Sequence, residues 1–274
     1  GMFIHWGLYS IPAKGEWIQS ADKISAEEYE KYAQHFKPDF FDPSEWARLA
    51  KRAGMKYAVF TAKHHDGFCM WDTKQTEYRI TGPDCPFRTH RHADICRHLF
   101  DAFRAEGLAI GTYFSKADWH TPTYWAPNRR KTTWRGPSYD PKSEPDLWEQ
   151  FVKFTHAQIL ELMQEYGRID ILWLDAGWVA AKYGQDMRIG DVIDQARQTQ
   201  PWLITADRTV GGPYENYVTP EQTVPAKPLG IPWESCITLG TSFSFKYEDN
   251  YKSLKEVVFL LIDVVAKGGN LALN

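Results

Sequence analysis

The amino-acid sequence predicts an α/β fold, a TIM-type (β/α)8-like barrel truncated before its last strand/helix unit. Seven strand-like runs alternate with helical segments along the 274 residues. Polar residues follow most of these runs, at the strand end where barrel enzymes carry their active sites. An open doubly wound sheet is the alternative. It is disfavoured because no Gly-x-Gly-x-x-Gly turn opens a helix anywhere in the chain.

The strands are predicted from short runs rich in β-branched, aromatic and other apolar residues. Residues 169–174 form the clearest run, because it is nearly all apolar, as a strand buried on both faces should be. The predicted strands are residues 2–6, 57–62, 108–115, 169–174, 203–206, 236–239 and 270–273.

The helices are predicted where apolar residues recur at i, i+3, i+4 and i+7, with a glycine at the end. Ser44 is the expected N-cap of the first helix and Asp94 that of the second. The predicted helices are residues 44–54, 94–107, 147–166 and 254–268. The longest irregular stretch, residues 119–145, is expected to lie as a loop across the barrel mouth.

Composition narrows the classes of partner. The chain has 32 Lys and Arg against 35 Asp and Glu, so it offers no basic surface for nucleic acid or an anionic membrane. It also contains no run of 18 apolar residues, and we expect no membrane insertion. Aromatic residues make up 15% of the chain, and many fall in loop-like stretches, which suits a site for sugar rings. The oligomeric state is left open.

The residues at the strand ends are the candidate functional residues. The first strand delivers His5, the second His64 and His65, and the fourth Asp175. Asp175 ends an apolar strand and is followed by small residues that leave room beside it, although a helix N-cap is the alternative reading. The fifth strand is followed by Arg208.

Metal binding is a rival interpretation of the histidines, because several His with Asp66 at strand ends would suit a zinc hydrolase. Neighbouring residues of an extended chain point to opposite sides, so His64 and His65 make an awkward chelating pair. The four cysteines have no metal-ligand spacing either. We therefore expect no metal and no other cofactor.

Five sequence blocks, spread in order through the chain, resemble glycoside hydrolase family 29, the α-L-fucosidases. The blocks are FIHWG at 3–7, KHHDGF at 63–68, LWLD at 172–175, PWE at 232–234 and KGGNL at 267–271. The resemblance implies a retaining exo-α-L-fucosidase that removes terminal α-L-fucose by double displacement. The implied partner is a fucosylated oligosaccharide or glycoconjugate. A non-catalytic glycan-binding barrel is the alternative from another functional class.

The resemblance also implies roles for individual carboxylates. Asp175 takes the place of the family's catalytic nucleophile, in a matching Trp-x-Asp context. Retaining hydrolysis needs a second carboxyl nearby as general acid/base, and Glu221 occupies the family's loop position for it. Glu234 is the alternative acid/base and Glu215 the next choice.

The remaining family positions are implied to bind one terminal fucose. Neutral imidazoles suit this task, since they donate at one nitrogen and accept at the other. Phe243 is implied to line the apolar wall for the 6-methyl group. The implied substrate-binding residues are His5, Glu16, Trp17, His64, His65, Tyr113, Arg208 and Phe243.

The organisation and compartment follow from the same resemblance. Residues 1–274 are expected to form one catalytic (β/α) barrel domain that is incomplete at both ends, with the family's C-terminal β-sandwich absent. The family implies an exported protein, periplasmic or extracellular, although this chain shows no leader.

Overall fold

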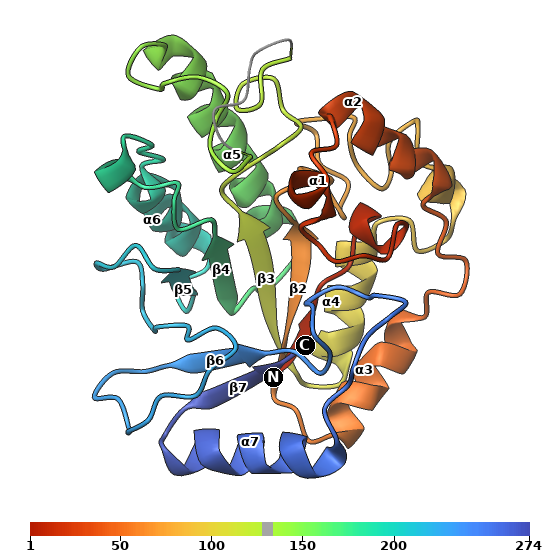
Figure 1. Ribbon diagram of the computed structural model, residues 1–274, viewed down its shortest axis with the longest axis vertical. Coiled ribbons are helices and arrows are strands. Elements are labelled where there is room, and N and C mark those ends of the chain that lie inside the picture. Colours follow the sequence, from red (N-terminus) through yellow and green to blue (C-terminus); the bar gives the residue numbers. More distant parts are fainter. Residues whose placement is uncertain (128–133) are drawn as a thin grey trace.

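The computed structural model describes residues 1–127 and 134–274. Within these residues, seven strands form one parallel sheet in the order β5-β4-β3-β2-β1-β7-β6. The sheet is curled, with helices on its outer side (Figure 1), so the predicted incomplete parallel barrel is confirmed. The strands are β1 Met2–Ile4, β2 Tyr57–Lys63, β3 Ala109–Ser115, β4 Ile171–Asp175, β5 Ile204–Asp207, β6 Glu234–Ile237 and β7 Asn270–Leu273.

The open side of the curled sheet lies between β5 and β6. β1 pairs with both β2 and β7, so the first and last strands are neighbours. Chain between β5 and β6 makes only isolated bridges, including Val218 with Trp233 and Glu221 with Cys236. This irregular segment bridges to both edge strands, to β5 through Glu215 and Ala206 and to β6 through Glu221 and Cys236.

All four predicted helices are present, and their ends lie within two residues of the predicted ones. α6 was not predicted, although Ile189, Val192, Ile193 and Ala196 follow the same spacing and are buried. The longer helices are α3 Pro43–Arg52, α4 Ile95–Ala105, α5 Pro145–Glu165, α6 Ile189–Thr199 and α7 Leu254–Ala266. Shorter elements are η1 Leu8–Ser10, α1 Ile18–Ala21, α2 Ala26–Tyr29, η2 Glu30–His35, η3 Pro86–Thr89 and η4 Ala181–Tyr183.

The predicted N-cap of α3 is wrong: the helix is capped two residues earlier than predicted, by a residue of another type. Asp42, not Ser44, caps this helix, since its carboxylate accepts hydrogen bonds from the backbone N–H groups of Ser44 and Glu45 at 2.9 and 3.1 Å. Pro43 then occupies the first turn, where a missing N–H costs nothing. Asp94 is confirmed as the cap of α4, accepting from the N–H of Arg97 at 3.1 Å.

Side chains from every strand of the sheet fill the barrel interior. Three large rings lie at its centre: Phe3 contacts Trp173 with ring centroids 5.2 Å apart, and Tyr113 stacks on Trp173 at 5.3 Å. All three are almost completely buried. This packed aromatic layer is the floor on which the site is built. The interior cluster consists of Phe3, Val59, Tyr113, Trp173, Ala206, Tyr217, Cys236 and Ala272.

Two buried ion pairs fix the loops at the C-terminal end of the sheet. Lys63, fully buried, donates to Asp118 at 3.1 Å and to Gln158 at 3.0 Å. Lys116, also fully buried, donates to Asp207 at 2.5 Å. Charges removed from water in this way need their partners, so each pair constrains the segments that carry it.

The helix α7 differs from the other long helices because most of its apolar side chains are exposed. Leu254 is 80% exposed, Val265 60% and Phe259 58%, while Val264 is buried. An apolar surface of this kind is unusual on an isolated domain. Among the described residues, no helix is both long and apolar enough to span a membrane.

We expect Asp118→Asn to destabilise the fold strongly. Asn keeps an acceptor for the backbone N–H groups of His120 and Thr121 but removes the charge that compensates Lys63. Leaving one buried charge uncompensated costs about 3–5 kcal/mol. Urea unfolding would measure the free-energy difference from the wild-type protein.

The matched control is Asp101→Asn, since Asp101 is 64% exposed in its ion pair. Exposed pairs contribute about 1 kcal/mol or less, so this variant should unfold close to the wild-type midpoint. Equal effects of the two substitutions would show that the buried pair does not carry the stability assigned to it.

Candidate active site

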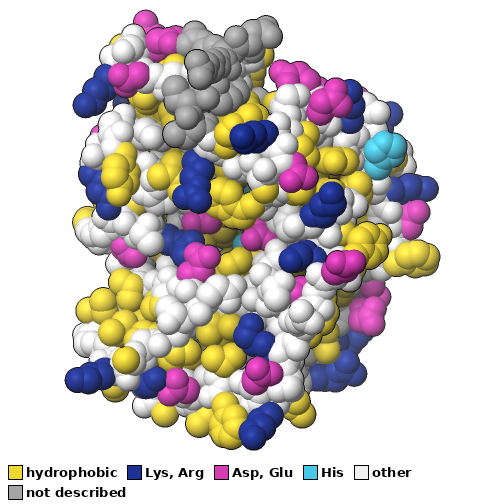
Figure 2. All heavy atoms as spheres, in the orientation of Figure 1, with side chains coloured by type: hydrophobic (Ala, Val, Ile, Leu, Met, Phe, Trp, Pro, Cys, Tyr) yellow, Lys and Arg dark blue, Asp and Glu magenta, His cyan; other side chains and the backbone are white. Residues whose placement is uncertain are grey.

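A cavity of about 230 Å³ lies at the C-terminal ends of the strands. In the space-filling view, acidic, basic and hydrophobic side chains gather in a hollow near the middle of the face (Figure 2). The cavity is lined by Phe3, His5, Glu16, Trp17, His64, Tyr113, Arg135, Trp173, Asp175, Trp178, Arg208, Glu221, Cys236 and Phe243. Nine of the residues singled out from the sequence are therefore brought together.

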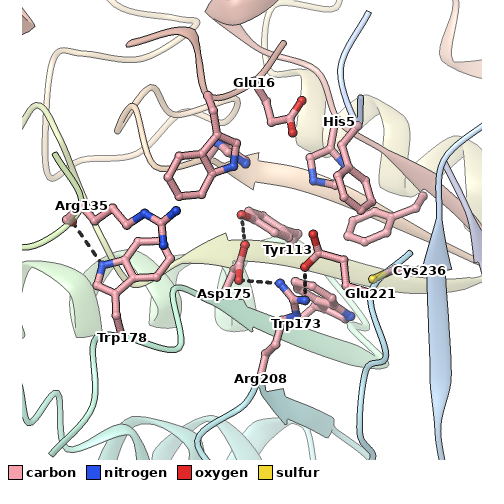
Figure 3. A pocket seen from close by; sticks show the side chains of 14 residues that line it. His5, Glu16, Tyr113, Arg135, Trp173, Asp175, Trp178, Arg208, Glu221 and Cys236 are labelled. Atoms are coloured by element: carbon pink, nitrogen blue, oxygen red, sulfur yellow. Dashed lines mark hydrogen bonds and ion pairs between the residues drawn. The ribbon is translucent and has the colours of Figure 1, made fainter. Parts of the chain in front are cut away.

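Asp175 lies at the end of β4, on the floor of the cavity, and its side chain is 14% exposed. The Tyr113 hydroxyl donates to one carboxylate oxygen at 2.6 Å, and Arg208 donates to the other at 3.1 Å (Figure 3). Burial alone would raise the pKa of this carboxyl, but the charge of Arg208 and the Tyr113 hydrogen bond outweigh it. The pKa of Asp175 is therefore far below its ordinary value, and the group is ionised.

Arg208 directly follows β5 and joins the two candidate carboxylates. Besides Asp175, its guanidinium donates to the Glu221 carboxylate (Figure 3). Its Nε also donates to the Thr219 hydroxyl at 3.3 Å. Burial acts to lower the pKa of Arg208, but the two carboxylates outweigh it and raise the pKa above its ordinary value. Asp175 and Glu221 therefore lie on one rigid fork of donors.

The turn after each of these two strands holds a residue with left-handed backbone. Ala176 has φ 67° and Thr209 has φ 62°, an uncommon conformation for a non-glycine residue and a strained one for β-branched threonine. Between them, a Cβ atom on Gly177 would lie 1.9 Å from the Thr209 hydroxyl and 2.8 Å from the Arg208 carbonyl. Only glycine allows the two turns to pack this closely.

His64 and His65 are buried, His5 is half-buried, and all three rings are neutral. His65 shares a 2.7 Å hydrogen bond with Ser115 and faces Asp175 at 3.7 Å, while His5 is bound to Asn274 at 2.6 Å. The Nδ1 of His64 has no partner among the described residues. Burial lowers the pKa of all three rings, that of His65 to about 4. No group of three or more His, Cys, Asp or Glu in the described residues is arranged to hold a metal ion.

Glu16 and the aromatic side chains form the walls. One carboxylate oxygen of Glu16 accepts from the Ser242 hydroxyl at 2.6 Å and the Ser244 N–H at 2.9 Å. Burial opposes ionisation of Glu16, yet hydrogen bonds such as those from Ser242 and Ser244 help to hold its pKa below the ordinary value.

The aromatic walls stand on opposite sides of the cavity. Trp17 packs edge-on against His65 at 5.0 Å, and Phe243 lies 4.8 Å from the His5 ring. One wall is therefore rich in indole and imidazole, and the other presents a phenyl face. His65 itself lies behind the cavity surface, in contact with Asp175.

Glu234 and Glu215 lie outside the cavity. Glu234 is the first residue of β6, at the opposite end of the strand from the cavity, and is buried. Its two oxygens accept from the Tyr57 hydroxyl at 2.5 Å and the Trp173 indole at 3.1 Å. Glu215 accepts from the N–H groups of Thr209 and Gly211 at 3.1 and 2.6 Å, so it caps the turn after β5.

Five lining residues were not singled out from the sequence. Side chains two residues apart on a strand point to the same face of the sheet. Phe3 lies two residues before His5, and Trp173 two before Asp175, so this spacing could have predicted both. Cys236 and Trp178 lie in predicted strands or strand exits. Arg135 comes from the predicted mouth loop, of which residues 128–133 lie outside the described part of the chain.

Comparison with known proteins decides the family. A sequence model described as "Alpha-L-fucosidase" matches residues 1–274. The chain belongs to the α-L-fucosidase family. Human plasma α-L-fucosidase is 28% identical over the whole chain, and the α-L-fucosidase of Dictyostelium discoideum is 25% identical. The chain spans about 60% of the length of these relatives, 60% of the first and 62% of the second.

Solved fucosidase structures share the fold. α-L-Fucosidase isoenzyme 1 from Paenibacillus thiaminolyticus is 37% identical with a TM-score of 0.85, covering 100% of this chain and 67% of that one. The unliganded α-L-fucosidase of Lactobacillus casei is 33% identical with a TM-score of 0.81, covering 100% of this chain and 87% of that one. The resemblance inferred from the five sequence blocks is thus confirmed at the level of family and fold.

Asp66, which directly follows the two histidines, does not line the cavity but should make stability depend on pH. It is almost fully buried and accepts from the Tyr29 hydroxyl and the Phe68 N–H, each at 3.2 Å. Burial raises its pKa from 3.8 to about 7. The folded state therefore binds the proton more tightly than the unfolded state. This stabilisation is fully present below about pH 4 and is lost as the pH rises to about 7.

We expect Asp66→Asn to remove this pH dependence, since Asn resembles the protonated acid. Relative to wild type, the variant should gain stability between pH 4 and 8, on the order of 4 kcal/mol at about 1.4 kcal/mol per pKa unit. Urea unfolding at several pH values measures the difference. Parallel wild-type and variant profiles would contradict the buried-acid interpretation.

Proposed function

We propose that this protein removes terminal α-L-fucose from fucosylated oligosaccharides or glycoconjugates by retaining hydrolysis. One observation carries the proposal. In a small cavity of an α-L-fucosidase fold, the Arg208 guanidinium binds two carboxylates, those of Asp175 and Glu221. Retaining glycosidases need two carboxyl groups close together, one as nucleophile and one as acid/base.

Asp175 is the proposed nucleophile. It is ionised and oriented by Tyr113 and Arg208, so it can attack the anomeric carbon without first losing a proton. A trapped covalent intermediate of the Bacteroides thetaiotaomicron α-L-fucosidase, 26% identical with a TM-score of 0.82, supports double displacement as the mechanism.

Glu221 is the proposed general acid/base. Its side chain is 43% exposed, against 14% for Asp175, so it lies toward the solvent side from which a leaving group departs and water enters. A carboxylate held by Arg208 accepts hydrogen bonds and cannot donate. The side chain must therefore take up a proton and face the glycosidic oxygen to protonate the departing alkoxide, and then receive a proton from water in the second step.

The neutral histidines are proposed to bind the fucose hydroxyls. His64 has an unpartnered ring nitrogen inside the buried site, which a sugar hydroxyl would satisfy. Glu16 and Trp17 complete the polar wall, and Phe243 faces the 6-methyl group. The apolar contact suits Phe243 because its ring, with that of His5, forms one face of the cavity.

The proposed compartment rests on the relatives, and the proposed single domain rests on the continuous sheet. Several are named plasma α-L-fucosidases, and we propose that this protein too is exported, acting on periplasmic or extracellular glycans. Residues 1–274 are proposed to act as one catalytic domain, because one continuous sheet provides every proposed site residue or the loop that carries it.

The test against a non-catalytic glycan-binding barrel is hydrolysis of an aryl α-L-fucoside. Release of the aryl group, with the first sugar product in the α configuration by NMR, is expected. Binding without release at any pH between 4 and 8 would favour the binding module.

We expect Asp175→Asn to fold normally and to lose at least about a thousandfold in kcat on an aryl fucoside, because the amide cannot form a glycosyl ester. Asp175→Gly should be partly rescued by azide, with a fucosyl azide of inverted configuration as product. Near-normal turnover of Asp175→Asn would end the assignment.

Comparing Glu221→Ala with Glu234→Ala should show which glutamate is the general acid/base and which only holds neighbouring side chains in place. An activated aryl oxygen departs with little protonation, whereas a sugar alkoxide does not. Glu221→Ala should therefore lose about a hundredfold or more on fucosyl oligosaccharides but far less on a dinitrophenyl fucoside, with azide giving fucosyl azide of retained configuration. Glu234→Ala should slow both substrates by similar factors, since its oxygens hold Tyr57 and Trp173.

The comparison of leaving groups decides between the two residues. If Glu234→Ala shows the leaving-group contrast and azide rescue while Glu221→Ala does not, the two roles must be exchanged. A Glu215→Ala control, which removes the cap of the turn after β5, should show neither signature.

A further inference from the structure

A second groove adjoins the candidate active site. It has a volume of about 400 Å³ and shares two of its walls, Arg135 and Trp178, with the smaller cavity. A molecule with its terminal sugar in the cavity and its next sugar in the groove would therefore contact Arg135 and Trp178. The groove is lined by Arg135, Gly136, Gly177, Trp178, Tyr183, Gln185 and Thr209.

The lining has the chemistry of a sugar subsite with a positive bias. Trp178 and Tyr183 offer aromatic faces, and Tyr183 is 59% exposed. The Gln185 Oε1 atom is buried and has no partner among the described residues. The described lining includes one cationic side chain, Arg135, and no carboxylate. A cation without a nearby carboxylate favours a ligand that carries negative charge.

Arg135 is held in place by its backbone rather than by a salt bridge. Its carbonyl oxygen accepts three hydrogen bonds, from the Trp119 indole at 3.1 Å, the Tyr124 hydroxyl at 2.9 Å and the Trp178 indole at 3.2 Å. Three donors on one carbonyl fix the position from which the side chain extends. The segment is therefore anchored to the wall that divides the cavity from the groove.

The Arg135 guanidinium lies over two aromatic rings, 5.0 Å from Trp17 and 5.9 Å from Trp178 (Figure 3). No carboxylate in the described residues pairs with it, in contrast to Arg208, which binds two. Stacking restricts the guanidinium plane but leaves its edge donors available to an anion.

A second cation stands at the rim. Lys182 donates to the Thr209 carbonyl at 3.2 Å and lies 5.3 Å from the Tyr183 ring. Thr209 is the strained residue that follows Arg208 and lines the groove. The groove is thus joined to the candidate catalytic turn on one side and flanked by two cations.

We propose that this groove binds the leaving-group sugar and favours one that carries a negative charge, as a sulfate ester or a carboxylate, with Arg135 as the specificity-determining residue. The proposal rests on the proposed fucosidase function of the adjoining cavity. In the bound state the leaving-group ring stacks on Trp178 or Tyr183, and its anionic substituent receives hydrogen bonds from Arg135.

The test compares kcat/KM for three kinds of substrate: an aryl α-L-fucoside, a neutral fucosyl disaccharide, and the same disaccharide with either a sulfate or a carboxylate. Arg135 also lines the cavity, so Arg135→Gln can lower every rate, and the readout is the ratio between substrates. The loss on the charged disaccharides should exceed the losses on the neutral disaccharide and the aryl fucoside by about tenfold, the size expected for one charge-assisted contact near the surface. In the wild type, the preference for charged substrates should shrink as salt rises from about 0.01 to 0.5 M.

Matched controls separate the groove from the cavity. Arg91→Gln removes an exposed arginine that lines neither, and should leave all three rates unchanged. Tyr183→Ala, which lines only the groove, should lower the rates on neutral and charged disaccharides alike while sparing the aryl fucoside.

The outcomes are distinguishable. Cleavage of the aryl fucoside with equal losses on neutral and charged disaccharides in Arg135→Gln would overturn the anion preference and leave the fucosidase function intact. Loss confined to the sulfated or to the carboxylated substrate would identify which anion the groove takes. Absence of cleavage for every substrate would contradict the proposed function itself.

Discussion

The Arg208 guanidinium is the interaction on which the rest of the site depends. It extends from the turn after β5, the edge strand at the open side of the curled sheet, and binds both Asp175 and Glu221. Burial acts to raise the pKa of Asp175, and the charge of Arg208 is the largest of the influences that lower it. The close packing of Gly177 against Thr209 keeps the two strand ends in register with each other. The geometry of the fork therefore depends on the backbone of two turns as much as on the three charged side chains.

Much of this was predictable because a parallel barrel concentrates its chemistry at one end of its strands. Reading the residue after each strand found His5, His64, Asp175 and Arg208, and the structure brings all four into one cavity. The helices were predictable from their apolar spacing and glycine ends. The cap of α3 was assigned wrongly because Asp42 and Ser44 are both good caps, and Pro43 between them decides in favour of the aspartate.

The rest depends on contacts that local pattern does not encode. Glu221 lies on chain that pairs with β6 through isolated bridges instead of a regular ladder, so neither strand alternation nor helix period marks it. Arg135 reaches the cavity from an irregular loop, and the three donors that fix its carbonyl come from residues 119, 124 and 178. Sequence places such residues only through family resemblance, and Arg135 lacked even that signal.

The charge state of the histidines matters for the rest of the site. Burial lowers the pKa of His5, His64 and His65, and the three rings lie against one another, with centroids 5.7 Å apart for His5 and His64 and 4.3 Å apart for His64 and His65. The positive charge that Asp175 requires comes from Arg208, so the imidazoles can remain neutral. Ionisation of the proposed nucleophile and recognition of hydroxyls are thereby assigned to different groups. That separation matters because a protonated imidazole only donates, whereas a neutral one can both donate and accept. In His5 and His65 one ring nitrogen is already bonded, to Asn274 and Ser115, so the role of the other nitrogen as donor or acceptor is set by that bond.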